Sequence, residues 1–191
     1  MLIAKHKLRL LSGITIICGA VALWSLNDNR KNDTNTTKAS KQDDIDFFVT
    51  DAKINTFSAS GELEQQATSP KIEHFKQRRS STIEKPFITQ FKNQQVSATI
   101  TSQNATVNDV TELVNFNQQV VAITFKDTVK NIQLKTPQLQ FDRKKSTLST
   151  EQDVEFTDTF GNITTARGMH SDIGLKTIHL KSNVKGTYNE K

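Results

Sequence analysis

The sequence predicts a mostly β protein in which antiparallel hairpins are stacked behind one N-terminal apolar segment. Three stretches share a skeleton anchored at Asn108, Asp142 and Asp172, and the anchors lie 34 and 30 residues apart. Repeats at such intervals mark stacked supersecondary units. Apolar residues recur at fixed offsets from each anchor: Ala105, Leu139 and Met169; Val114, Leu148 and Ile178; Val120, Val154 and Val184. Because the anchors are turn-forming residues, each unit reads as strand, turn and strand.

The length and the charge of the chain limit its organisation and its partners. We expect one domain with an appendage from 191 residues. The first 26 residues carry three basic residues and no acidic one, which leaves 22 basic against 20 acidic residues in the rest. The basic character of the chain is therefore largely an N-terminal effect. The totals do not support a nucleic-acid partner.

Residues 1–26 are predicted to form a short cytoplasmic stub and a single transmembrane helix. The run from Leu10 to Leu26 contains 17 uncharged residues, which is at the short end of what spans a hydrocarbon core of about 30 Å. Trp24 lies where an interfacial anchor is expected. The alternative is a cleaved signal peptide, because Ala20 and Ala22 form an A-x-A-like site. The apolar run continues past that site, which favours a retained anchor.

The next segment, residues 27–44, is predicted to be a flexible linker. It holds a single apolar residue, Ala39, among Asn, Asp, Thr and Lys. Such a composition cannot bury enough apolar surface to fold. The domain proper is therefore expected to cover residues 45–191. All residues that follow the membrane helix are expected to be translocated across the membrane.

The domain begins with a strand over residues 45–57, in which Phe48, Ala52 and Ile54 share one parity. A turn at residues 58–61 leads to a weaker strand over 62–67 and a further strand over 71–75. We expect a charged loop over 76–81 and an edge or strand start near Phe87, after Pro86. The three repeat units follow from Val96 onwards. No helical periodicity is found in this part of the chain.

The last predicted strand, from Thr177 to Tyr188, has no covering element after it in the sequence. Unpaired backbone groups on an edge strand recruit further strands. We therefore expect a partner to bind here by strand addition. The alternative is a protected edge, because Lys181 and Lys185 are charged residues of the kind that block edges.

The sequence lacks the motifs that would indicate catalysis or a bound cofactor. None of the four histidines stands at a metal-ligand spacing from another ligand. The sequence contains no nucleophile elbow, phosphate loop or dinucleotide fingerprint. The recurring aspartates lie near turns, where turn formation explains them. The sequence thus predicts a protein that is not an enzyme and has no cofactor.

The chain resembles the LptC family, the bitopic inner-membrane components of the bacterial lipopolysaccharide export system. Three features carry the resemblance: the N-terminal span, the entry segment DFFVTDA at residues 46–52, and the ending over residues 166–188. The family often has glycine two residues before the repeat valine, where this chain has Gln118, Gln152 and Ser182. We therefore expect a less marked strand bend at these positions.

The resemblance implies an open, twisted β-jellyroll of the OstA/LptA-like kind with an apolar trough for lipopolysaccharide acyl chains. The residues assigned to lipid binding on this basis are Phe48, Ile54, Ile72, Val114, Phe116, Val120, Leu148, Val154, Phe156, Ile178, Leu180 and Val184. The N-terminal edge would dock on LptF/LptG-like permease subunits of an ABC transporter, and the C-terminal edge on a periplasmic LptA-like protein. The residues assigned to these partners are Phe47, Val49, Thr177, His179, Lys181, Asn183, Lys185 and Tyr188.

The sequence supports two functional hypotheses. The leading one is a non-catalytic lipid-transfer scaffold, anchored by a single pass in the inner membrane with its C-terminal domain in the periplasm. The alternative is a soluble periplasmic LptA-like bridge protein that assembles by strand addition after signal cleavage. The sequence does not distinguish an open trough from an interior filled by side chains, because both need the same inward residues.

Overall fold

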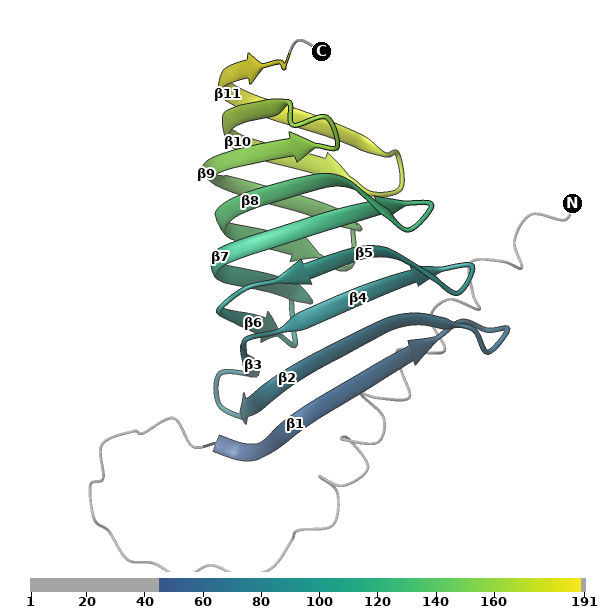
Figure 1. Ribbon diagram of the computed structural model, residues 1–191. Coiled ribbons are helices and arrows are strands. Elements are labelled where there is room, and N and C mark those ends of the chain that lie inside the picture. Colours follow the sequence, from purple (N-terminus) through teal and green to yellow (C-terminus); the bar gives the residue numbers. More distant parts are fainter. Residues whose placement is uncertain (1–44, 190–191) are drawn as a thin grey trace, which may run out of the picture.

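The computed structural model describes residues 45–189, and Figure 1 shows their strands stacked from β1 at the bottom to β11 at the top. The predicted membrane helix and linker lie outside the described residues. No helix in the described part is long and apolar enough to cross a membrane. The strands are β1 (Ile45–Phe57), β2 (Leu63–Phe75), β3 (Ser80–Glu84), β4 (Phe87–Lys92), β5 (Gln95–Thr101), β6 (Asn104–Asn108), β7 (Leu113–Lys126), β8 (Val129–Asp142), β9 (Thr147–Asp158), β10 (Ile163–Asp172) and β11 (Thr177–Thr187).

All pairings between these strands are antiparallel, and two long strands hold the stack together. The first half of β2 pairs with β4 and its second half with β3. In the same way, β7 pairs with β6 through its first half and with β5 through its second half. Beyond β7 the strands β8, β9, β10 and β11 follow in simple order, and β1 lies outside β2. The two edge strands of the described sheet are therefore β1 and β11.

The predicted repeat units are confirmed as hairpins. Asn108, Asp142 and Asp172 end β6, β8 and β10, and each leads through a tight turn into the next strand. Their side-chain carboxylates or amide oxygens accept hydrogen bonds from backbone N–H groups in the turns, at 2.8 to 3.0 Å. The turn chemistry that marks the repeat in the sequence thus closes each hairpin.

The predicted separation of residues 62–67 and 71–75 into two strands is wrong, because β2 is continuous across Ser69 and Pro70. Pro70 is tolerated within β2 because the strand changes partner there, from β4 to β3. The predicted loop over 76–81 is also shorter, since β3 already begins at Ser80.

The long strands bend near their middle, and these bends form a line across the stack. The register is interrupted between Asn117 and Val120 in β7, and left-handed backbone conformations occur at Gln118 and Gln119. Gly168 of β10 and Asn183 of β11 are left-handed as well. The bend at Gln118 is thus present without the glycine of the family pattern, although a non-glycine residue in this conformation costs on the order of 1 kcal/mol.

Buried hydroxyl groups satisfy the backbone where the ladder is interrupted. Ser69, Ser102 and Thr136 each donate a hydrogen bond to the carbonyl two residues further along, at 2.8, 2.8 and 3.2 Å. All three are buried side chains. Because an unpaired buried carbonyl is costly, these hydroxyls allow the strands to bend inside the protein.

The bend divides the stack into two facing layers. Layer A contains β4, β5 and the halves of the long strands that continue beside them, such as the first half of β2 and the second half of β7. Layer B contains β3, β6 and the other halves of the long strands, such as the second half of β2 and the first half of β7. Side chains from both layers form one hydrophobic cluster, whose fully buried members include Leu139 and Met169 from layer B and Val120 at the bend. The mostly β, jellyroll-like architecture of the sequence prediction is confirmed for the described residues.

Candidate functional site: an apolar interior and two open edges

The interior face of layer A carries one register row that crosses nine strands. Its first seven members are apolar, and its last two are small or polar. The row runs through Ile54, Ala67, Ile88, Ile100, Ala122, Leu134, Phe156, Thr164 and Gly186. In layer B a second row runs through Val49, Ile72, Ile83, Ala105, Phe116 and Leu139. The interior is therefore apolar along almost the whole stack.

Exposure along this interior changes from the middle to the ends. In the middle, Phe116 of β7 and Leu139 of β8 are 2% and 0% exposed, so side chains fill the space between the layers. At the C-terminal end, Ile178 and Val184 are 51% and 55% exposed. At the N-terminal end, Ile54 is 45% exposed. The trough is thus filled in the middle and open to solvent at both ends.

The structure places eleven of the twelve residues assigned to lipid binding on the inward face. Phe48 is the exception: it pairs with Glu73, alternates with the inward Val49, and is 65% exposed. Its shared parity with Ile54 is lost because Asp51 adopts a left-handed conformation (φ 50°) between them. One such residue shifts the alternation of side chains between the two faces. The prediction that Phe48 faces the interior is therefore wrong.

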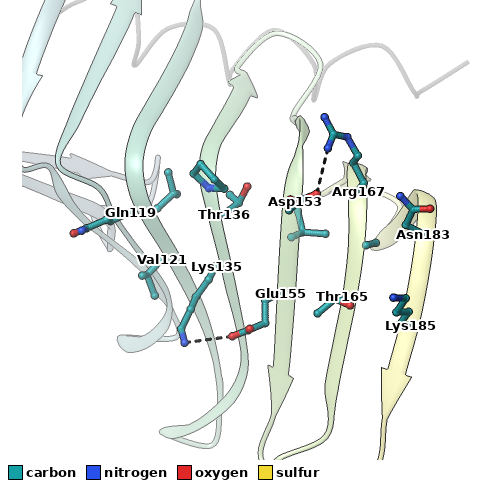
Figure 2. A pocket seen from close by; sticks show the side chains of 14 residues that line it. Gln119, Val121, Lys135, Thr136, Asp153, Glu155, Thr165, Arg167, Asn183 and Lys185 are labelled. Atoms are coloured by element: carbon teal, nitrogen blue, oxygen red, sulfur yellow. Dashed lines mark hydrogen bonds and ion pairs between the residues drawn. The ribbon is translucent and has the colours of Figure 1, made fainter.

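A hollow of about 960 Å³ lies on the outer face of the bend rather than between the layers. Figure 2 shows a row of its lining residues across five neighbouring strands: Val121, Lys135, Glu155, Thr165 and Lys185. On each strand, the residue of this row is the direct neighbour of the inward-facing residue of layer A, so its side chain points to the outer face. Ion pairs cross this hollow between Lys135 and Glu155 at 3.3 Å and between Arg167 and Asp153 at 3.9 Å. The hollow is thus lined by charged side chains beside apolar ones such as Val121 and Pro137.

The two edge strands leave backbone and apolar side chains accessible. Among the described residues β11 pairs only with β10, and β1 pairs only with β2. Of the residues assigned to partners, Thr177 and His179 lie on the outward face of β11, while Phe47 and Val49 lie on the inward face of β1. Lys181 forms an ion pair with Glu151, and Tyr188 is exposed. Both edges are therefore suited to accept another strand.

The C-terminal end of β11 is held in place by a short chain of hydrogen bonds. Asn189 N–H donates to the Asn162 side chain at 3.0 Å, and the Asn162 amide donates to Asp158 at 2.8 Å. Asp158 is the last residue of β9, and Asn162 lies in the turn that leads to β10. The residues that follow β11 are thus connected to the turn between β9 and β10.

A histidine cluster at the N-terminal end was not predicted from the sequence. His74 of β2 lies between two carboxylates, with Nδ1 at 2.5 Å from Asp46 and Nε2 at 2.9 Å from Asp109. Phe47 stacks on its ring at a centroid distance of 4.7 Å. Burial alone would lower the pKa of His74, but hydrogen bonds and charges from Asp109 and Asp46 outweigh this and raise the pKa. The two carboxylates are 28 and 35 residues away along the chain, so no local motif indicates the cluster.

Comparison with known proteins gives a family and a fold. The family model described as "Lipopolysaccharide-assembly, LptC-related" matches residues 14–189. The structure of LptH, described as the LptA-homologous periplasmic component of the lipopolysaccharide transport device of Pseudomonas aeruginosa, is similar with a TM-score of 0.52. That similarity covers 66% of this chain and 95% of LptH at 9% sequence identity, so it concerns the fold alone. No curated protein sequence matches the chain.

Proposed function

This chain belongs to the LptC-related family of lipopolysaccharide-assembly proteins, and from that premise we propose that it is a membrane-tethered lipid-transfer scaffold. In this proposal the protein receives lipopolysaccharide from an inner-membrane ABC transporter and passes it to a periplasmic bridge protein. Family and fold together support a lipopolysaccharide-transport scaffold rather than an enzyme. Beyond this general role, we propose the membrane tether, the ABC transporter as the source of the lipid and the bridge protein as its acceptor.

The observation that carries the proposal is the apolar interior that runs from one open edge strand to the other. Each methylene group exposed to water costs roughly 0.8 kcal/mol, so a lipid with several long chains does not cross an aqueous compartment unaided. An interior with apolar residues on consecutive strands offers such chains an alternative to water at every step. A transfer role therefore needs no catalytic group.

The two edges give the proposed scaffold a direction. The N-terminal edge strand β1 follows directly on the linker and predicted membrane helix, so permease subunits in the same membrane would meet this edge first. The C-terminal edge strand β11 lies at the other end of the stack, where a second jellyroll could continue the sheet by strand addition (Figure 1). The alternative, a soluble bridge protein, would use both edges for assembly with similar jellyrolls.

Membrane association separates the two roles. After carbonate extraction of inner membranes, the full chain is expected in the pellet, and its N-terminal sequence should begin upstream of the apolar run. Recovery in the soluble fraction with a new N-terminus near Leu23 would refute the tether and favour the soluble bridge.

Lipid cargo is tested by site-specific photo-crosslinking in cells. A crosslinker at Leu180, on the interior face at the open C-terminal end, is expected to capture lipopolysaccharide. A crosslinker at Asp142, in the turn between β8 and β9, serves as the control and should capture none. Equal labelling at the two positions would indicate nonspecific lipid association and count against the trough.

A further inference from the structure

The turns at the free end of layer B form a row that is fixed by backbone hydrogen bonds. Asp109 N–H donates to the Arg79 carbonyl at 3.0 Å, Arg143 N–H to the Glu112 carbonyl at 3.4 Å, and Ile173 N–H to the Ser146 carbonyl at 3.1 Å. These bonds connect the turns at residues 76–79, 109–112, 143–146 and 173–176 in succession. The four turns therefore lie side by side along one rim of the jellyroll.

This rim concentrates the positive charge of the domain. Its sixteen turn residues include seven basic and two acidic ones, a net charge of +5. All described residues together hold 17 basic and 15 acidic residues, a net charge of only +2. The turns at the free end of layer A, residues 58–62, 93–94, 127–128 and 159–162, contain two acidic residues and no basic one. We call the four turns of layer B the basic rim.

Several cations of the basic rim have no structural task within the described residues. Lys144 forms an ion pair with Glu112 and donates to the Val110 carbonyl, and Lys145 forms an ion pair with Asp142. In contrast, the exposed side chains of Lys76, Arg79, Arg143 and Lys176 form no ion pair or hydrogen bond with any residue from 45 to 189. A row of such cations attracts anions, and several together are more effective than isolated charges.

The basic rim borders the apolar interior directly. The outermost inward row of layer B runs through Val107, Val114, Phe141, Leu148, Ser171 and Ile178, within a few residues of the four turns. An acyl chain against this row would bring its headgroup to the turns. A ligand that matches both surfaces has several acyl chains and a phosphorylated headgroup.

We infer that the basic rim binds the phosphate groups of the glycolipid whose acyl chains occupy the interior, with Arg79, Arg143 and Lys176 as the main cations. This inference rests on the proposed lipid-transfer function and assigns the headgroup to one rim. Arginine forms bidentate hydrogen bonds with phosphate, whereas lysine acts as a point charge. Recognition by exposed cations weakens as salt screens the charges.

The test compares the full chain in neutral phosphatidylcholine nanodiscs with two variants, using bisphosphorylated lipid A and its dephosphorylated form as ligands. The test variant is Arg79→Gln/Arg143→Gln/Lys176→Gln, which spares the cations with structural partners. The control variant is Lys92→Gln/Lys126→Gln, which removes two exposed cations near the turns of layer A. Binding is measured by competition for photo-crosslinking at Leu180, at low and high salt.

The unchanged protein is expected to bind the phosphorylated lipid about tenfold more tightly, since each exposed charge pair contributes up to a few-fold. The test variant should lose this preference and keep its affinity for the dephosphorylated form, while the control variant should keep both. Equal affinity of the unchanged protein for the two forms, or an unchanged preference in the test variant, would overturn the inference. The inference would also be overturned if inorganic phosphate or phosphatidylglycerol vesicles competed for photo-crosslinking at Leu180 as effectively as bisphosphorylated lipid A does. If neither lipid form crosslinks at all, the proposed lipid-transfer function itself fails.

Discussion

Truncating a side chain in the filled middle of the interior should cost far more stability than the same change at its open end. Leu139 is 0% exposed and packs in the central cluster, so Leu139→Ala should destabilise the fold by about 2–5 kcal/mol. Ile178 is 51% exposed. Full burial of such a side chain contributes about 1.5–3 kcal/mol, so Ile178→Ala should cost only about 1 kcal/mol.

The assay is equilibrium unfolding in urea, followed by far-ultraviolet circular dichroism of the β-sheet signal in the full chain held in mild detergent. With a slope of roughly 2 kcal/mol per molar urea, the midpoint should fall by about 1–2.5 M for Leu139→Ala and by about 0.5 M for Ile178→Ala. Equal shifts for the two variants would refute the reasoning, because they would mean that the middle of the interior is as open as its end.

Two further predictions concern the N-terminal cluster and the C-terminal edge. Because the pKa of His74 is raised in the folded protein, the cluster contributes stability that is fully present below the unfolded-state pKa of about 6.5 and is lost as pH rises through the folded pKa. His74→Gln should remove this pH dependence, as measured by thermal unfolding at several pH values, and His179→Gln should leave it; a dependence retained in His74→Gln would contradict the assignment. At the C-terminal edge, Val184→Pro and Lys185→Pro each remove one N–H group, and neighbouring N–H groups point to opposite sides of a strand. One of the two prolines should therefore weaken binding to an LptA-type partner in a pull-down while protease resistance persists, and the other should mainly destabilise the pairing with β10. Normal binding by both folded variants would exclude strand addition at β11.

The hairpins could be predicted from the sequence because their determinants are local. Asn108, Asp142 and Asp172 specify their turns through side-chain contacts with the next few backbone groups. The alternation of side chains between the two faces of a strand could be predicted from the sequence only as far as the next bend of that strand. At Asp51 the left-handed backbone shifts the parity, and this placed Phe48 on the wrong face. A bend that depends on one dihedral angle leaves no signal in hydrophobic periodicity.

The features missed by sequence reasoning depend on contacts between distant residues. His74 gains its carboxylate partners only when β1, β2 and the turn after β6 come together. The basic rim is equally hidden, because its cations are scattered over a hundred residues of the chain and their charge nearly cancels in the total. Whether the interior is open or filled also depends on how closely the two layers approach, which residue types alone do not determine.

The filled middle of the interior has a thermodynamic consequence for any lipid that moves along it. When an acyl chain moves from one strand to the next in this part of the interior, it leaves contacts with apolar side chains and gains other contacts of the same kind. This movement releases no ordered water. The hydrophobic gain is obtained once, when the chain leaves water, and is nearly constant from strand to strand. Such a path lowers barriers without creating a gradient. Net direction would then have to be supplied from outside this domain, by work done at one end or by removal of lipid at the other.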